Sequence, residues 1–129
     1  MYRLLFYFLI SLLFISCVNN NKITIINNAQ EQITFNFRAS QTPVASGSNV
    51  TIKDIPNGTY LYSTIFTLPA GATSWTTSGN AGSGSLTFLR NQTTYMIIYS
   101  STLIDGVYTL YSSVSSTDTV SSGHSITGP

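Results

Sequence analysis

Few side chains in this sequence could do acid–base or nucleophilic chemistry. There is one histidine, His124, and there are four carboxylates, Glu31, Asp54, Asp105 and Asp118. The stretch closest to the Gly-x-Ser-x-Gly elbow of a serine hydrolase, Gly82-Ser83-Gly84, is expected to be a flexible loop without the strand-to-helix turn. The base would have to be His124, which lies in an expected mobile tail. A glycosidase needs two carboxyl groups about 5–9 Å apart, and the spacing of these acids indicates no such pair. We therefore expect a protein that is not an enzyme.

Metals, cofactors and nucleic acids are not expected as ligands either. Cys17 is the only cysteine, which excludes a disulfide framework and a thiolate metal site. The acids show no calcium-loop spacing, and no glycine-rich phosphate loop is present. Five basic residues against four acidic ones give a net charge of +1, too little for the clustered cations that nucleic acid binding requires.

The residues before Cys17 have the pattern of a secretory signal. One positive charge, Arg3, precedes an apolar run over 4–15 that is interrupted only by a serine. Twelve helical residues span about 18 Å, which is too short for a hydrocarbon core of about 30 Å. No charged residue follows the run directly, so we expect residues 1–16 to be a signal peptide outside the folded body.

Cys17 stands where the apolar run ends. Phe14-Ile15-Ser16-Cys17 resembles the lipobox of bacterial lipoproteins, with Phe14 in place of the usual leucine. The resemblance implies that the Cys17 sulfur receives a diacylglyceryl group, that Cys17 becomes the mature N-terminus, and that fatty acids such as palmitate hold the protein in a membrane. The alternatives are an ordinary cysteine in a signal anchor or in a plain cleaved signal.

Residues 17–21 would then be the lipidated cysteine and a short tether. Val18 replaces the Asp that retains enteric-type lipoproteins in the inner membrane, which is compatible with the outer membrane or the cell surface of a bacterium. We therefore expect an envelope location, with the membrane as one partner through the lipid anchor.

The rest of the chain alternates between apolar and polar residues, as half-buried strands do. The clearest case places Ile33, Phe35 and Phe37 on one face of a strand. We expect an all-β protein, a single antiparallel β-sandwich of about seven strands over residues 22–114. The expected strands cover 22–26, 31–39, 50–53, 60–68, 85–90, 94–104 and 107–114.

The connections between these strands differ in how clearly they are marked. Asp105-Gly106 predicts a two-residue hairpin that sets Leu103 opposite Tyr108 and Thr102 opposite Thr109. Residues 69–84 are expected to form a long loop. Residues 115–129 form a Ser/Thr-rich segment expected to be a mobile tail, in which 117–120 could add an edge strand.

One stretch resembles a known type of module. Val50-Thr51-Ile52-Lys53-Asp54-Ile55-Pro56-Asn57-Gly58-Thr59-Tyr60 is similar to the strand, apolar-Pro-x-Gly-x-Tyr turn and next strand of prealbumin-like and related Ig-like modules on bacterial surface proteins. The resemblance implies a sandwich in which the Tyr60 ring covers an edge. Such modules are commonly non-catalytic.

Exposed aromatic rings are the remaining functional signal. Trp75 lies in the expected loop, and Tyr60 and Tyr62 share one face of a strand. Sugar-binding sandwiches use such rings, although tyrosines more often cover core edges and Trp75 could be a lid on the core. We expect a non-enzymatic binding module for a glycan or an envelope protein. The alternative is a structural accessory lipoprotein that docks to a larger envelope complex through a sheet edge.

Overall fold

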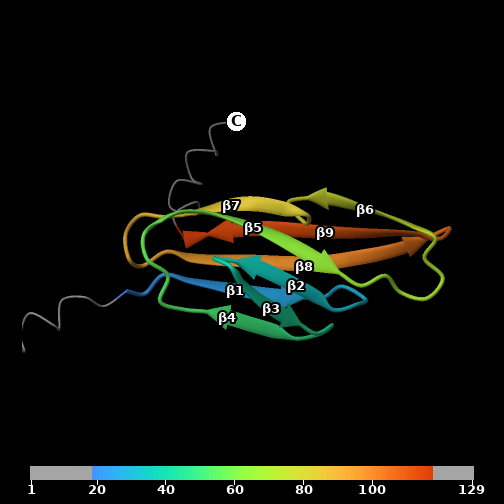
Figure 1. Cartoon of the computed structure of the whole chain (residues 1–129), viewed down its shortest axis with the longest axis horizontal. Helices are drawn as coiled ribbons and strands as arrows, with labels where there is room; N and C mark the ends of the chain where they lie inside the picture. Colours follow the sequence, from blue (N-terminus) through green and yellow to red (C-terminus); the bar gives the residue numbers. More distant parts are fainter. Residues whose placement is uncertain (1–18, 118–129) are drawn as a thin grey trace, which may run out of the picture.

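Residues 19–117 are described by the computed structural model, and they form an all-β structure (Figure 1). The strands are β1 (Lys22–Asn27), β2 (Ile33–Phe37), β3 (Ser40–Val44), β4 (Asn49–Ile52), β5 (Gly58–Phe66), β6 (Ser74–Gly79), β7 (Ser83–Phe88), β8 (Thr94–Ile104) and β9 (Val107–Ser116). Within this part of the chain, no helix is long and apolar enough to cross a bilayer. The expected signal peptide, Cys17 and residues 118–129 lie outside the described residues.

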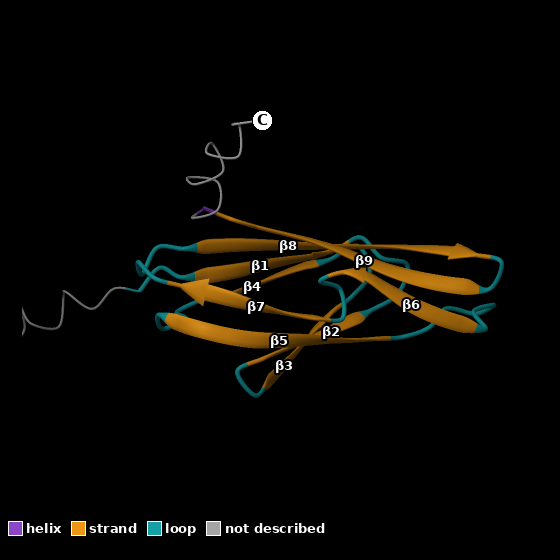
Figure 2. Ribbon diagram, turned by 90° about the horizontal axis from the view of Figure 1, so that it is seen from above, coloured by secondary structure: helices purple, strands orange, loops and turns teal. Residues whose placement is uncertain are grey.

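The strands form two sheets that lie face to face (Figures 1 and 2). The five-stranded sheet has the order β4-β1-β8-β9-β6, and the four-stranded sheet has the order β3-β2-β5-β7. The prediction of a purely antiparallel arrangement is wrong, because β1 pairs with β8 and β6 pairs with β9 in parallel. Parallel pairing needs a long connection between the two strands, and here strands of the other sheet lie within that connection.

The expected number of about seven strands falls short of the nine observed in the described part, because two edge strands carry almost no apolar alternation. β3 pairs only with β2 and contains Pro43, which a strand tolerates at an edge. β6 pairs only with β9, and five of its six residues are exposed. The expected loop over 69–84 is therefore wrong for Ser74–Gly79 and for the start of β7.

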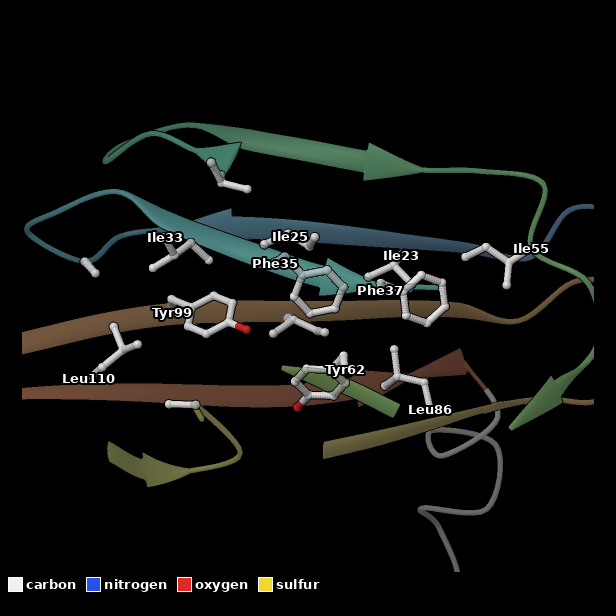
Figure 3. Close-up of a cluster of buried hydrophobic side chains, with 14 of the residues drawn as sticks. Ile23, Ile25, Ile33, Phe35, Phe37, Ile55, Tyr62, Leu86, Tyr99 and Leu110 are labelled. Atoms are coloured by element: carbon white, nitrogen blue, oxygen red, sulfur yellow. The ribbon is translucent and has the colours of Figure 1, made fainter. Parts of the chain in front are cut away.

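A single core of alternating side chains joins the two sheets (Figure 3). The predicted inward face of β2 is confirmed, since Ile33, Phe35 and Phe37 are all buried. Across the gap, the Tyr99 hydroxyl of β8 is 2.7 Å from the Thr64 hydroxyl of β5. Burial raises the pKa of Tyr99 and of Tyr62 above the ordinary tyrosine range. Both phenols are therefore neutral parts of the core.

The hairpin between β8 and β9 has the predicted register. Leu103 lies opposite Tyr108, and Thr102 lies opposite Thr109. Asp105 and Gly106 have φ angles of 52° and 80°, the two positive values that a type I′ turn requires. This short turn lets β8 and β9 pair along most of their length, and β9 continues to Ser116, two residues beyond its expected end.

Candidate functional site

The two ends of the sandwich differ in the segments that form them. β1 and β8 begin side by side, with Lys22 opposite Thr94, and β9 ends there, with Ser116 opposite Tyr95. We call this the proximal end and define it by residues 19–21, 53–58 and 89–93. At the other end, the β8–β9 turn lies beside the start of β6, with Ser74 opposite Val107. We define this distal end by residues 66–75 and 103–108 (Figure 1).

A network of asparagine side chains holds the proximal end together. Asn21 is fully buried, and its Nδ2 donates to the Ile55 carbonyl at 2.8 Å and to the Asn57 Oδ1 at 2.9 Å. Its Oδ1 accepts the main-chain N–H of Thr93 at 2.9 Å. One side chain thus joins three segments that are distant in the sequence.

The two residues before this asparagine in the expected tether are bound as well. Asn19 Nδ2 donates to the Ile55 carbonyl at 2.6 Å, and the Asn20 N–H donates to the Asn91 carbonyl at 2.7 Å. The expected tether over 17–21 is thus wrong for Asn19–Asn21, which belong to the folded body. Only Val18 separates Asn19 from Cys17 in the sequence.

Trp75 lies at the distal end on the outer edge strand of the larger sheet. Its partner in register, Tyr108, points into the core, so Trp75 extends from the same face of the sheet at the border of the core. The indole packs edge-on against Phe66, with ring centroids 5.4 Å apart, yet 58% of the residue is exposed. Trp75 therefore caps Phe66 and still presents much of its surface to solvent.

Other apolar residues are exposed at the same end. Ile104 is 63% exposed, and Leu68 and Val107 are also exposed. The segment before β6 is fixed to the hairpin, because the Thr73 N–H donates to the Gly106 carbonyl at 2.8 Å. The distal end thus carries four exposed large apolar side chains, Leu68, Trp75, Ile104 and Val107. Ile104 and Val107 pair on the outer face of the larger sheet, whereas Trp75 extends from its inner face beside Phe66.

The two tyrosines singled out in the sequence belong to the core and its border rather than to the Trp75 surface. The Tyr60 ring packs against Phe37 and Phe88, and its hydroxyl donates to the Pro56 carbonyl at 2.8 Å. This bond closes the Pro-x-Gly-x-Tyr turn. Tyr62 is only 3% exposed, and its ring stacks on Phe35.

A glycine on the neighbouring strand makes room for the Tyr62 ring. Gly84 lies opposite Tyr62, and a Cβ atom at position 84 would come within 2.6 Å of the Tyr62 hydroxyl oxygen. That hydroxyl donates to the Asn80 carbonyl at 3.2 Å. Both tyrosines therefore have structural contacts that account for them, and of the three predicted binding residues Trp75 is the most exposed.

The sequence did not indicate a shallow hollow on the outer face of the smaller sheet. The hollow has a volume of about 650 Å³, and its lining includes Asn36, Arg38, Leu61, Ser63, Ser83 and Ser85. Leu61 is 79% exposed at its side. Asn36 Nδ2 donates to the Ser63 hydroxyl, whereas the buried Asn36 Oδ1 has no hydrogen-bond partner. Arg38 lies 5.6 Å from the centre of the Tyr60 ring.

The acidic residues of the described part lie in separate connections between strands. No group of three or more metal-ligating side chains occurs within residues 19–117. Asp105 occupies the hairpin turn at the distal end, and Asp54 lies between β4 and the Pro56 turn at the proximal end. His124 and Asp118 lie outside the described residues.

The sequence was compared with protein-family models and with curated proteins. No protein-family model matches the chain, and no curated protein sequence is similar to it.

Proposed function

We propose that this protein is a lipid-anchored, non-enzymatic binding module of a bacterial envelope, exposed at the outer membrane or the cell surface. Acylation of Cys17 would hold it in the membrane, and the folded body would be a prealbumin-like or Ig-like β-sandwich. The observation that carries the proposal is the exposed surface of the Trp75 indole, which is held against Phe66 at the distal end. This surface lies opposite the end at which the chain leads back to Cys17 (Figure 1).

The chemistry of the distal end suits an uncharged ligand. A partly exposed indole is costly to leave in water, and it can stack on the apolar face of a sugar ring or on an apolar peptide side chain. Thr73 is exposed two residues before Trp75, and its hydroxyl, which donates to the Gly106 carbonyl at 3.3 Å, could accept a hydrogen bond from a ligand. Asp105 is the only charged residue of the distal end, so shape and apolar contact would decide the binding. A glycan or an envelope protein is the expected ligand.

The proposal can be tested with Trp75→Ala and the matched control Leu61→Ala. Both residues are exposed apolar side chains, but Leu61 lies on the outer face of the smaller sheet. Binding of the two variants to purified envelope glycans and to whole cells is compared with that of the wild type. We expect Trp75→Ala to weaken binding at least tenfold with a nearly unchanged melting temperature. Equal binding by Trp75→Ala and the wild type would refute the distal site.

One observation favours a second candidate, the docking of an accessory lipoprotein through a sheet edge. β6 has a free edge, and its sequence SWTTSG contains neither the charge nor the proline that commonly protects edge strands. A partner strand could add to it through main-chain hydrogen bonds. Thr76→Lys would place a charge on this edge. If Thr76→Lys abolished association with an envelope complex while Trp75→Ala did not, edge docking would be the function.

A further inference from the structure

We propose that the proximal end of the sandwich rests directly on the anionic headgroup surface of the membrane, with Leu89 inserted among the lipids. This inference depends on the proposed acylation of Cys17. It goes further by assigning a second, non-covalent membrane contact to named residues of the folded body, and this contact would fix the orientation of the domain.

The segment between the proposed anchor, Cys17, and the first bound residue of the folded body, Asn19, is short. Asn19 is already bound to the Ile55 carbonyl, and Asn21 is buried among the other segments of the proximal end. Two residue steps separate Cys17 from Asn19 and span at most about 7 Å when fully extended. This reach is close to the Debye length of about 8 Å at physiological ionic strength. The proximal end would therefore lie within about one Debye length of the headgroups, where screening of its charges is incomplete.

The distribution of charge also supports the proposed contact. Lys22 begins β1, Lys53 directly follows β4, and Arg90 lies in the connection between β7 and β8. Among the described residues, Asp54 is the only acidic one at the proximal end. Lys22, Lys53 and Asp54 line a small hollow of about 240 Å³ together with Asn19–Asn21. The excess of cations fits a surface of anionic lipid headgroups.

The acidic residues elsewhere in the described part lie away from this end. Asp105 is in the turn at the distal end, and Glu31 follows the far end of β1 in the connection to β2. The charges of residues 19–117 are thus distributed unevenly along the length of the sandwich. This uneven distribution would turn the Trp75 surface away from the membrane.

An exposed leucine, Leu89, directly precedes Arg90. Leu89 is 68% exposed, although its main chain is held in place: its carbonyl accepts from Asn57 Nδ2 at 3.4 Å. Two residues later, the Asn91 N–H donates to Asn57 Oδ1 at 3.1 Å. The loop therefore presents Leu89 on a fixed backbone. An exposed apolar side chain next to a cation, here Arg90, is typical of segments that sit at the boundary of headgroups and acyl chains.

The test uses the full chain, processed in a lipoprotein-producing host and reconstituted in vesicles containing phosphatidylglycerol. Because Cys17 would be acylated, a cysteine placed at Leu89 provides the only free thiol for an environment-sensitive fluorophore. Ile104→Cys at the distal end is the matched control, since Ile104 is 63% exposed and Leu89 is 68% exposed. Spin-labelled lipids then report which label reaches the bilayer. Intact mass confirms the acyl chains on each preparation.

We expect a blue-shifted, strongly quenched label at position 89 and an unquenched label at position 104. The variant Lys22→Gln/Lys53→Gln/Arg90→Gln should lose this quenching, because each cation contributes about fivefold and the three together roughly a hundredfold to membrane contact. Equal quenching at both positions of an acylated protein would overturn the proposed orientation and leave the anchor intact. Unchanged quenching in the triple variant would overturn the role of the charges. A mass without acyl chains would remove the proposed function, and this inference with it.

Discussion

Replacement of Asn21 by alanine should destabilise the fold far more than its place in a run of asparagines suggests. The variant loses three side-chain hydrogen bonds, to the Ile55 carbonyl, the Asn57 amide oxygen and the Thr93 N–H, and two of these are buried. At about 1 kcal/mol net for each bond, the loss is about 3 kcal/mol, and it is larger where buried groups are left unsatisfied. A typical domain has a stability of about 5–15 kcal/mol, so this is a large fraction.

The assay is urea unfolding of the mature chain carrying Cys17→Ser, followed by fluorescence and circular dichroism. The neighbouring asparagines are matched controls with the same side chain. Asn20 is exposed and contributes its main-chain N–H, so Asn20→Ala should change stability by less than about 0.5 kcal/mol. Asn19→Ala removes bonds to the Ile55 carbonyl and the Asn21 N–H, and should cost about 1–2 kcal/mol. Equal midpoints for Asn21→Ala and Asn20→Ala would refute this reasoning.

Further predictions concern the core, one glycine and alkaline pH. Phe35→Ala should cost about 3–5 kcal/mol in urea unfolding, because the ring is fully buried and stacks on Tyr62. Thr34→Ala, on the outer face of the same strand, should cost much less, and the opposite order would contradict the assigned faces. Gly84→Ala should lower stability by about 1–3 kcal/mol, because its Cβ would meet the Tyr62 hydroxyl at 2.6 Å. Gly82→Ala meets only Thr77 at 3.4 Å and should be nearly neutral, so an equal loss at both glycines would contradict the clash. The pKa values of Tyr62 and Tyr99 are raised in the folded state, so their stabilising effect is complete below the unfolded tyrosine pKa of about 10 and is lost as the pH rises above it. Unfolding midpoints measured from pH 8 to 11 should fall above pH 10, and a flat profile would contradict the burial of these phenols.

The parts of the fold that sequence could predict are those set by local alternation and turn chemistry. The alternating apolar residues of β2 indicate its buried face directly, and Asp105-Gly106 fixes the register of β8 and β9. The parallel pairing of β1 with β8 has no local signal, because it joins residues about 70 positions apart. β3 and β6 escaped prediction for a related reason: an edge strand with few buried side chains needs no apolar alternation.

The functional residues, too, could be predicted only where a local sequence pattern marks them. Trp75 could be singled out as the only tryptophan, but its contact with Phe66 depends on how β6 lies against the end of β5. Asn19–Asn21 look like a polar spacer in the sequence. Their role arises because the amide of Asn21 satisfies main-chain groups 34 and 72 residues away. A run of asparagines looks the same in the sequence whether it forms a spacer or a buried hydrogen-bond network. Only the three-dimensional structure distinguishes these two roles.

The central claim is that the protein is held in a bacterial membrane through Cys17, and incorporation of labelled fatty acid tests it most directly. The wild-type chain and the Cys17→Ser variant are expressed in a lipoprotein-processing bacterium supplied with labelled palmitate, and membrane and soluble fractions are compared. We predict label and membrane association in the wild type, with both lost together in Cys17→Ser. A Cys17→Ser protein that stays equally membrane-bound, or a wild-type protein that takes up no label, would contradict the account.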